Sequence, residues 1–132
     1  MANQFVMIRI SIIVATYNRG HQLVRTLQSL ASQTLQSEQW EAVIENNNST
    51  DDTQRLFDDF LKDTPGAGNI RMVFEGRQGL SHARNRGISE CQGMYIAIID
   101  DDEQVNPDFT SQHAVFFYSH TDAAAAGGKI KP

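Results

Sequence analysis

The sequence predicts an α/β protein, arranged as a three-layer α/β/α sandwich with a mainly parallel sheet in the middle. Short apolar segments rich in β-branched residues alternate with segments whose apolar residues recur at helical spacing, in the order βαβαβαβαβ. This alternation is typical of parallel strands joined by right-handed crossovers. The 132 residues, 40% of them hydrophobic, suffice for one packed core, so a single domain over residues 1–132 is expected.

The first half of the chain contains two predicted strands and two predicted helices. Residues 9–15 are apolar and β-branched, which is typical of a strand buried on both faces. Residues 20–33 place leucines on one face of a helix, and residues 40–45 form a second short strand. A second helix is expected to open at Ser49, because Ser49 and Asp52 have the spacing of a capping box.

A third strand and a third helix follow a loop rich in proline and glycine. Residues 70–75 form the strand, Ser81 is expected to cap the helix, and Gly93 ends it. The side chains of this helix that are expected to face the core are Ala83, Gly87, Ile88 and Cys91.

The last predicted elements are a strand, a helix and a final strand. Residues 94–99 are continuously apolar, so this strand is expected to lie in the centre of the sheet. The helix is expected to start at Asn106 with Pro107 in its first position, and residues 123–130 form the final strand. The side chains expected to line that helix are Phe109, His113, Phe116 and Phe117.

Composition excludes several classes of function. The net charge of −5 argues against nonspecific binding to nucleic acid or to an anionic membrane. A single cysteine excludes an internal disulfide framework and a cysteine-based zinc site, and it fits a reducing compartment. No apolar stretch approaches the roughly 20 residues of a membrane span, and no signal peptide is recognised.

Polar residues follow each of the first four predicted strands, where open α/β sheets bind ligands. They occupy residues 16–19, 46–51, 76–79 and 100–103. A dinucleotide-binding domain is excluded because Gly-x-Gly-x-x-Gly does not follow the first strand. A receiver domain is excluded because its acidic pair would also stand there.

Four consecutive carboxylates, Asp100 to Glu103, end the apolar strand over residues 94–99. Such a run raises pKa values or requires a cation. Asp100 and Asp102 would face the same side of extended backbone, which suits Mg²⁺ or Mn²⁺ together with phosphate oxygens and water. An EF-hand is excluded because Val105 replaces its required glycine. The alternative is a solvated acidic loop that caps the next helix.

Three arginines, Arg77, Arg84 and Arg86, precede this strand and are expected to cluster. Arginine together with a cation is a common way to neutralise a diphosphate. The alternative for each arginine is a surface ion pair. His82 is interpreted as a surface residue and Cys91 as part of the core.

Four blocks of sequence carry a resemblance to a known family. They are SIIVATYNR at 11–19, NNNSTDDT at 46–53, GLSHARNRG at 79–87, and DDDE at 100–103 with Pro107 following. In this order they resemble the N-terminal, nucleotide-sugar-binding half of a family 2 glycosyltransferase. The resemblance covers residues 9–131 and implies a truncated, Rossmann-like GT-A fold, the nucleotide-diphospho-sugar transferase fold.

The resemblance implies a metal-dependent, inverting transfer of a sugar from a UDP- or GDP-sugar to a hydroxyl acceptor, with Mg²⁺ or Mn²⁺ as cofactor. The acceptor would be a glycan, a lipid or another hydroxyl compound, and no nucleic acid is involved. The acceptor half and the general base are absent, so no catalytic residue is expected in this chain, which alone would be inactive. The implied location is the cytoplasm or, for a longer protein, the inner membrane face. A non-catalytic nucleotide-binding module is the alternative.

The resemblance also assigns roles to individual residues. Asp102 matches the last residue of the family's DxD motif, which binds the metal, and Asn46 replaces the family's usual acid at the base. Arg84 would approach the diphosphate and Asp100 the ribose or the sugar. Glu45 is unusual at the end of an apolar strand, and no role is assigned to it. The residues implied to contact the nucleotide are Thr16, Tyr17, Asn18, Asn46, Arg84, Asp100 and Asp101.

Overall fold

The computed structural model describes residues 8–120, which contain a four-stranded parallel sheet in the order β3-β2-β1-β4. The strands are β1 (Ile10–Thr16), β2 (Trp40–Asn46), β3 (Ile70–Phe74) and β4 (Tyr95–Asp100). The helices are α1 (Gly20–Ala31), α2 (Thr53–Asp63), α3 (Leu80–Glu90) and α4 (Phe109–Ser119), with a short 3-10 helix, η2 (Ser37–Gln39).

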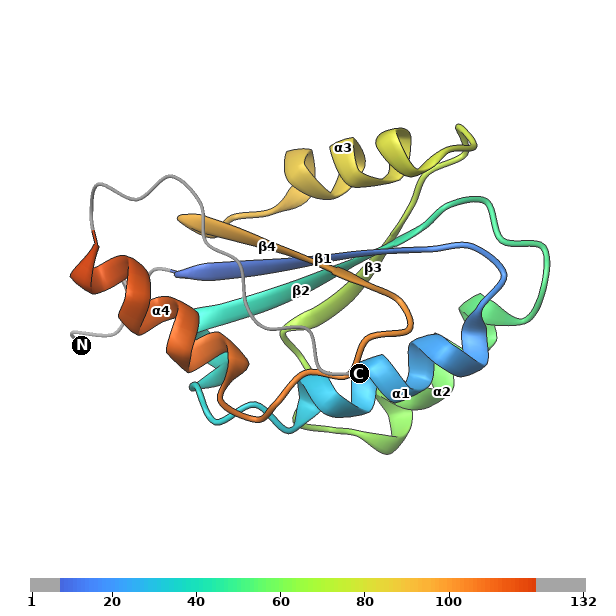
Figure 1. The fold of residues 1–132 in the computed structure, drawn as a ribbon. Coiled ribbons are helices and arrows are strands. Elements are labelled where there is room, and N and C mark those ends of the chain that lie inside the picture. The colour runs from blue at the N-terminus through green and yellow to red at the C-terminus, as the bar shows by residue number, and fades with distance from the viewer. Residues whose placement is uncertain (1–7, 121–132) are drawn as a thin grey trace.

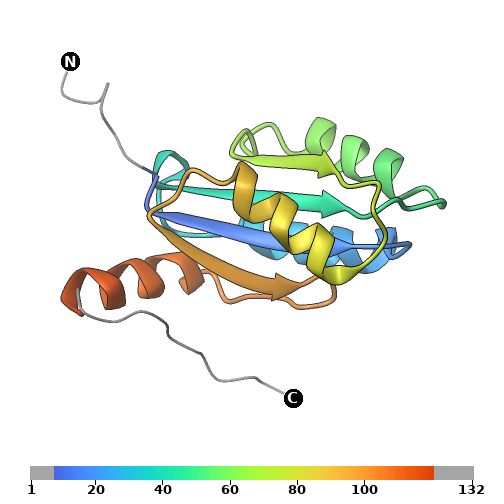
Figure 2. The ribbon, with the colours of Figure 1, turned by 90° about the horizontal axis from the view of Figure 1, so that it is seen from above.

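Helices cover both faces of the sheet, which confirms the predicted three-layer α/β/α arrangement. Helix α3 lies on one face, and α1 and α2 lie on the other (Figure 1). The view from above shows the strands running in the same direction, with α3 crossing over them (Figure 2). Helix α4 joins the α1 side, where Phe117 stacks on Tyr95 of β4 with ring centroids 4.2 Å apart.

The core forms where the apolar faces of β1 and β2 meet the leucines of α1. Ile12, Val14 and Ile44 are fully buried with Leu23 and Leu27, because the helical spacing of the leucines presents them to the sheet. Since side chains alternate along a strand, the odd-numbered residues of β1 face α3 instead. The sheet is therefore covered on both faces at its centre.

Strand β4 differs from the prediction. Its continuous apolar sequence predicted a central position, but within residues 8–120 it lies at the end of the sheet, next to β1. Ile96 and Ile98 are 42% and 49% exposed, because α3 covers β1 and β2 rather than β4. Ile88 and Cys91 of the α3 segment were predicted to be in the core; Ile88 is exposed and Cys91 is half-buried.

The predicted helix starts were wrong by a few residues. Helix α2 opens at Thr53, and the capping box does not form; the Thr53 N–H donates to Oδ1 of Asp51 instead (3.0 Å). Helix α3 opens at Leu80 without a side-chain cap, so Ser81 is not a cap. Helix α4 opens at Phe109, after a turn that contains Pro107.

Two further predictions concern the ends of the chain and membranes. The strand predicted over residues 123–130 lies outside the described residues. Within residues 8–120, no helix has the length and apolarity needed to cross a membrane.

Candidate functional site

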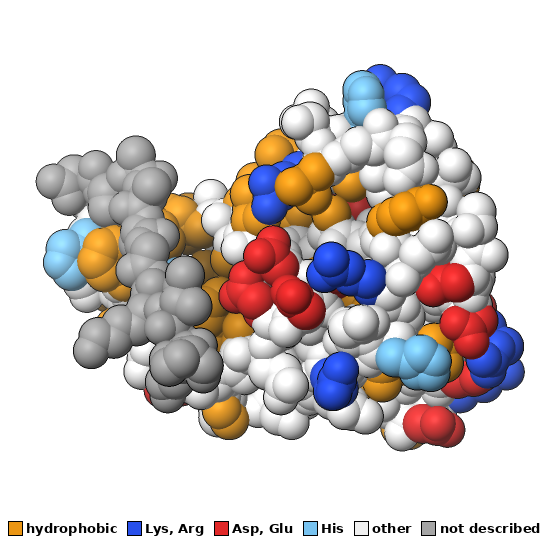
Figure 3. All heavy atoms as spheres, turned by 45° about the vertical axis from the view of Figure 1, so that its right-hand side comes forward, with side chains coloured by type: hydrophobic (Ala, Val, Ile, Leu, Met, Phe, Trp, Pro, Cys, Tyr) orange, Lys and Arg blue, Asp and Glu red, His pale blue; other side chains and the backbone are white. Residues whose placement is uncertain are grey.

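The carboxyl ends of the parallel strands bring polar residues together at one edge of the sheet. Thr16 at the end of β1 is paired in register with Asn46 at the end of β2, and Ala15 is paired with Asp100 of β4. On this side of the molecule, acidic side chains gather with basic side chains next to them (Figure 3). Strand register therefore places the blocks singled out in the sequence beside one another.

Asn18 joins the loop after β1 to the loop after β2. Its Oδ1 accepts hydrogen bonds from the backbone N–H groups of Thr50 (2.7 Å) and Asp51 (3.1 Å), and its own N–H donates to Oγ of Ser49 (3.0 Å). Its φ of 52° lies in the left-handed region, which asparagine tolerates better than most residues. Tyr17, just before it, is 46% exposed and lies at the surface of the site.

Asn46 is buried, and its side chain is already engaged. Its Oδ1 accepts a hydrogen bond from the Ser49 N–H at 3.0 Å, which closes a turn after β2. This bond uses one lone pair of the amide oxygen. The Asn46 Nδ2 makes no hydrogen bond to the described residues, so it remains a donor for a ligand.

Asn47 fixes the loop after β3, a role that the sequence analysis did not assign. Its Nδ2 donates to the carbonyl oxygens of Glu75 (3.0 Å) and Arg77 (2.7 Å), and its Oδ1 accepts from the Gly79 N–H (2.9 Å). The signal for it was the second of three asparagines directly after β2. Asn47 thereby sets where α3 begins relative to β2.

The acidic run does not continue the strand. Strand β4 ends at Asp100, and a turn closed by the Glu103 N–H and the Asp100 carbonyl (3.1 Å) follows. The expectation that Asp100 and Asp102 share a face of extended backbone is therefore wrong, because the alternation stops at Asp100. Asp100 and Asp102 nevertheless both remain at the surface, with side chains 61% and 55% exposed.

Asp101 points inward and holds the turn in place. Its Oδ2 accepts a hydrogen bond from Thr16 Oγ1 (2.9 Å), and its carbonyl oxygen accepts one from Thr26 Oγ1 (2.8 Å). Burial raises the pKa of Asp101, while the Thr16 hydroxyl and the charge of Arg19 lower it. Asp101 and Thr16 therefore satisfy each other and position the residues around them.

Two arginines reach the acidic turn from opposite faces of the sheet. Arg84 of α3 has Nη2 3.7 Å from Oδ1 of Asp100. Arg19, directly before α1, has Nη1 3.5 Å from Asp101 Oδ1 and 3.6 Å from Asp102 Oδ2. The sequence analysis gave Arg19 no role, although it stands inside the first block.

The predicted cluster of three arginines does not form. Arg77 pairs with Glu75 at 3.1 Å, and Arg86 pairs with Glu90 at 3.1 Å within α3. Arg77 and Arg86 therefore form surface ion pairs, which was the alternative given for each arginine in the sequence, whereas Arg84 lies at the acidic turn.

The arrangement suits a hard divalent cation only if a ligand completes its coordination. Among residues 8–120, no three His, Cys, Asp or Glu side chains converge on one point. Asp102, with Asp100 nearby, offers exposed carboxylate oxygens, whereas Asp101 is turned inward. Mg²⁺ is commonly held by one or two carboxylates, with phosphate oxygens and water as its other ligands. The residues therefore fit a cation that binds together with a phosphate compound.

A family model connects this geometry with known proteins. The model described as Glycosyl transferase family 2 matches residues 11–131, which is most of the chain. Among curated proteins, the uncharacterized glycosyltransferase YibD of Escherichia coli K12 is 32% identical over 99 residues. That match covers 75% of this chain and 27% of YibD.

Solved structures share the fold. TarS from S. aureus superposes with a TM-score of 0.77 at 24% identity, over 86% of this chain and 33% of the TarS 1–349 chain. The mannosyltransferase PcManGT from Pyrobaculum calidifontis gives a TM-score of 0.67 at 26% identity, over 74% of this chain and 28% of that one. The chain thus spans about a quarter to a third of the length of these proteins.

Proposed function

This chain belongs to glycosyltransferase family 2, and from that premise we propose that it binds the nucleoside diphosphate part of a sugar donor. In a longer protein, the donor sugar is transferred to a hydroxyl acceptor with inversion at the anomeric carbon. The observation that carries the proposal is that Arg84 of α3 lies 3.7 Å from Asp100 at the carboxyl end of β4, directly before the turn that exposes Asp102. Open α/β sheets bind ligands at such strand ends.

The base and ribose are proposed to lie against the loop after β1. Thr16, Tyr17 and Asn18 form this wall, with the exposed ring of Tyr17 at its surface and Asn18 fixing its shape. Asn46 is proposed to donate from Nδ2 to the base, because this amide group makes no hydrogen bond to the described residues, whereas its Oδ1 already accepts one from the Ser49 N–H. An amide donor there would recognise a carbonyl oxygen of the base.

The diphosphate is proposed to lie between Arg84 and the acidic turn. The guanidinium of Arg84 binds phosphate oxygens, and Asp100 accepts hydrogen bonds from hydroxyl groups of the ribose or the sugar. Asp102 holds a divalent cation, and Asp101 contributes by positioning the turn. A bound cation would supply positive charge that stabilises the departing diphosphate.

Relatives support the choice of ligand and cation. Crystal structures of TarS contain UDP or UDP-GlcNAc, and the structure of PcManGT is a complex with GDP-Man and Mn²⁺. We accordingly propose a UDP- or GDP-sugar as donor and Mg²⁺ or Mn²⁺ as cation. The acceptor site and the general base are proposed to belong to a part of the longer protein outside this chain.

Isothermal titration calorimetry with UDP and GDP, each with and without Mn²⁺, tests the proposal. We expect saturable binding of at least one of the two that strengthens with Mn²⁺. Arg84→Ala should weaken it about tenfold or more, since hydrogen bonds to charged groups contribute about 1.5–3 kcal/mol. Arg86→Ala, two residues along α3 and paired with Glu90, is the matched control and should leave it within about twofold, because exposed pairs contribute little. No binding of either nucleotide by the folded protein would contradict the proposal.

Sugar transfer separates an enzyme from a non-catalytic module. In the longer protein we expect release of nucleoside diphosphate from the donor when a hydroxyl acceptor is supplied. Binding without any release of diphosphate or sugar would favour the non-catalytic nucleotide-binding module.

A further inference from the structure

Glu45 of β2 is a buried carboxyl group that the site described above does not use. Its side chain is fully buried, and neither carboxyl oxygen has a hydrogen-bond partner among the described residues. Buried polar groups in native proteins are nearly always partnered, so an orphaned carboxyl group needs an explanation.

Glu45 lies below Arg84 and in line with Asp100. In the parallel register, Glu45 is opposite Ala15, and Ala15 is opposite Asp100, so all three side chains point to the α3 face. On α3, Gly87 stands directly over the carboxyl group: a Cβ there would lie 2.6 Å from Glu45 Cδ. Arg84 is one helical turn before Gly87, on the same side of the helix.

The charge of Glu45 determines whether Arg84 has one carboxylate near it, that of Asp100, or two. Burial raises the pKa of Glu45 to about 9, and the Val14 backbone and the positive charge of Arg84 oppose this shift only in part. At neutral pH, Glu45 is therefore uncharged, and Asp100 is the anion that pairs with Arg84. Guanidinium N–H groups remain available to a ligand.

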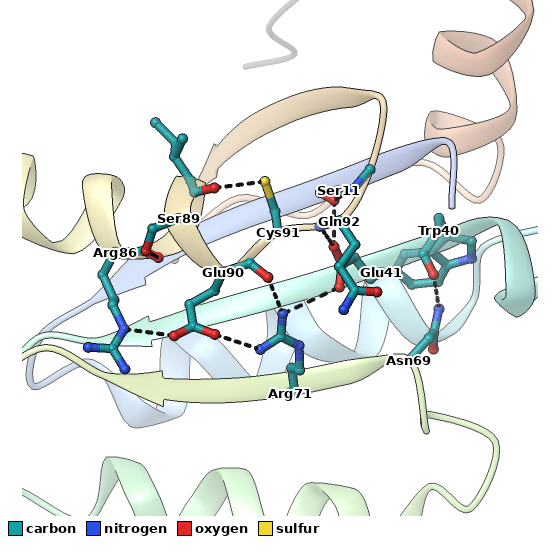
Figure 4. A network of polar contacts seen from close by, with 12 residues as sticks. Ser11, Trp40, Glu41, Asn69, Arg71, Arg86, Ser89, Glu90, Cys91 and Gln92 are labelled. Atoms are coloured by element: carbon teal, nitrogen blue, oxygen red, sulfur yellow. Dashed lines mark hydrogen bonds and ion pairs between the residues drawn. The ribbon is translucent and has the colours of Figure 1, made fainter. Parts of the chain in front are cut away.

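Other charged groups around Glu45 are paired elsewhere or lie at the site. Figure 4 shows Glu41, Arg71, Glu90 and Arg86 joined in one chain of contacts near the start of the strands. Glu75 is held by Arg77, and β1 contributes no titratable side chain to this face. The charged groups on the elements packed against Glu45 are Glu41 of β2, Arg71 of β3, Glu75 after β3, Arg84, Arg86 and Glu90 of α3, and Asp100 of β4.

We propose that Glu45 is a positioning residue for Arg84. The uncharged carboxyl group of Glu45 beneath α3 leaves the guanidinium of Arg84 directed at the diphosphate. The inference rests on the proposed function. When Glu45 loses its proton, its carboxylate competes with the diphosphate for Arg84 from below, and the affinity for the nucleotide falls. A substitution that leaves no ionisable group at position 45 abolishes this loss of nucleotide affinity at high pH.

The pH dependence of UDP affinity, with Mg²⁺ at every pH, tests the inference. We expect the wild-type protein to bind UDP about fivefold more weakly at pH 10 than at pH 8, which corresponds to a coupling of about one pKa unit for a group with a pKa of about 9. Glu45→Gln should bind as the wild type does at pH 7 and lose much less affinity at pH 10. Glu45→Met provides the same comparison if the glutamine variant does not fold. Since titration of the uracil ring is common to all the proteins, only the difference between their profiles is used.

Two controls make the test specific. Glu41→Gln changes a carboxyl group on the same strand and face that pairs with Arg71, and it should keep the wild-type pH profile. Calorimetry at pH 9 in two buffers of different ionisation enthalpy should show more proton uptake on UDP binding by the wild type than by Glu45→Gln. Parallel profiles and equal proton uptake would overturn the inference while leaving the proposed function intact.

Failure of the proposed function has a different signature. If no variant binds UDP at any pH, the ¹⁵N NMR signal of Arg84 Nε still decides the inference. This signal is identified by its absence from the spectrum of Arg84→Lys. We expect this signal to shift with a midpoint near pH 9 in the wild type and not in Glu45→Gln. An Arg84 signal that titrates identically in both proteins would show that Glu45 does not act on Arg84.

Discussion

Asp101 and Asp102 are adjacent residues that the structure places in opposite environments. Asp101 is buried and accepts a hydrogen bond from Thr16, whereas Asp102 is largely exposed and has only Arg19 within 4 Å as an ion-pair partner among the described residues. The sequence shows four acids in a row and predicts a cation nearby. It cannot show which carboxylate points outward, because the chain turns after Asp100 and the alternation of a strand no longer applies.

Asp102→Ala should separate metal binding from stability. Exposed ion pairs contribute about 0–1 kcal/mol, so the melting temperature should change little. The strengthening of UDP binding by Mn²⁺ should be largely lost, since Asp102 is the proposed ligand. Calorimetry with and without Mn²⁺ measures this, and an unchanged Mn²⁺ effect would exclude Asp102 as the ligand.

Asp101→Ala, by contrast, should lower the stability of the fold. It leaves the Thr16 hydroxyl buried without its partner, which costs about 1–3 kcal/mol of the free energy of unfolding. Urea unfolding followed by circular dichroism measures this cost. Thr16→Val/Asp101→Ala, which removes both partners, should recover part of it, and a double variant less stable than both single variants would contradict the pairing.

At the scale of elements, the alternation of strands and helices was predictable, but their exact starts were not. The strand predicted over residues 40–45 is β2, and that over residues 70–75 is β3, because apolar β-branched runs are strong local signals. The start of α2 was misplaced because Ser49 accepts a hydrogen bond from Asn18, more than thirty residues earlier. Such a contact between loops leaves no trace in local sequence.

Gly87→Ala tests how closely α3 packs on the sheet. In an open helix this change is stabilising by about 1 kcal/mol, since alanine is the better helix former. Here the new Cβ would lie 2.6 Å from Glu45 Cδ and 2.7 Å from Ile13 Cγ2, and overpacking costs about 1–3 kcal/mol. We therefore expect a net loss of stability in urea unfolding. Ser89→Ala, an exposed change on the same helix, is the control, and a stabilised Gly87→Ala would show that α3 can move away from β2.

At the scale of the whole molecule, the layered fold follows from the sequence, whereas the pairing of charges does not. The alternating order of elements fixes a parallel sheet, and the sheet brings the four blocks to one edge. Which arginine of α3 reaches that edge depends on the rotation of the helix about its axis. Gly87 allows the close contact with β2 that places Arg84 near Asp100 while Arg86 pairs with Glu90.

The stability of the whole molecule should depend on pH through Glu45. Its pKa is about 9 in the folded protein and near 4.5 in the unfolded chain, so between these values the folded protein holds a proton that the unfolded chain has lost. The free energy of unfolding should therefore decrease as pH rises from 4.5 to 9, at up to about 1.4 kcal/mol per pH unit from this group. Glu75 acts in the opposite sense, because Arg77 lowers its pKa to about 2, and its contribution is lost as pH falls below 4.5.

Urea unfolding of the wild type and Glu45→Gln between pH 3.5 and 8.5 isolates the contribution of Glu45, since all other groups are common to both proteins. As pH rises across this range, the free energy of unfolding of the variant should increase relative to that of the wild type by several kcal/mol, at up to about 1.4 kcal/mol per pH unit. Below pH 4.5 the difference should become constant, because Glu45 is then protonated in both states. A difference that does not vary with pH would mean that Glu45 ionises as readily in the folded protein as in the unfolded chain, through a rearrangement that brings water or Arg84 to its carboxyl group.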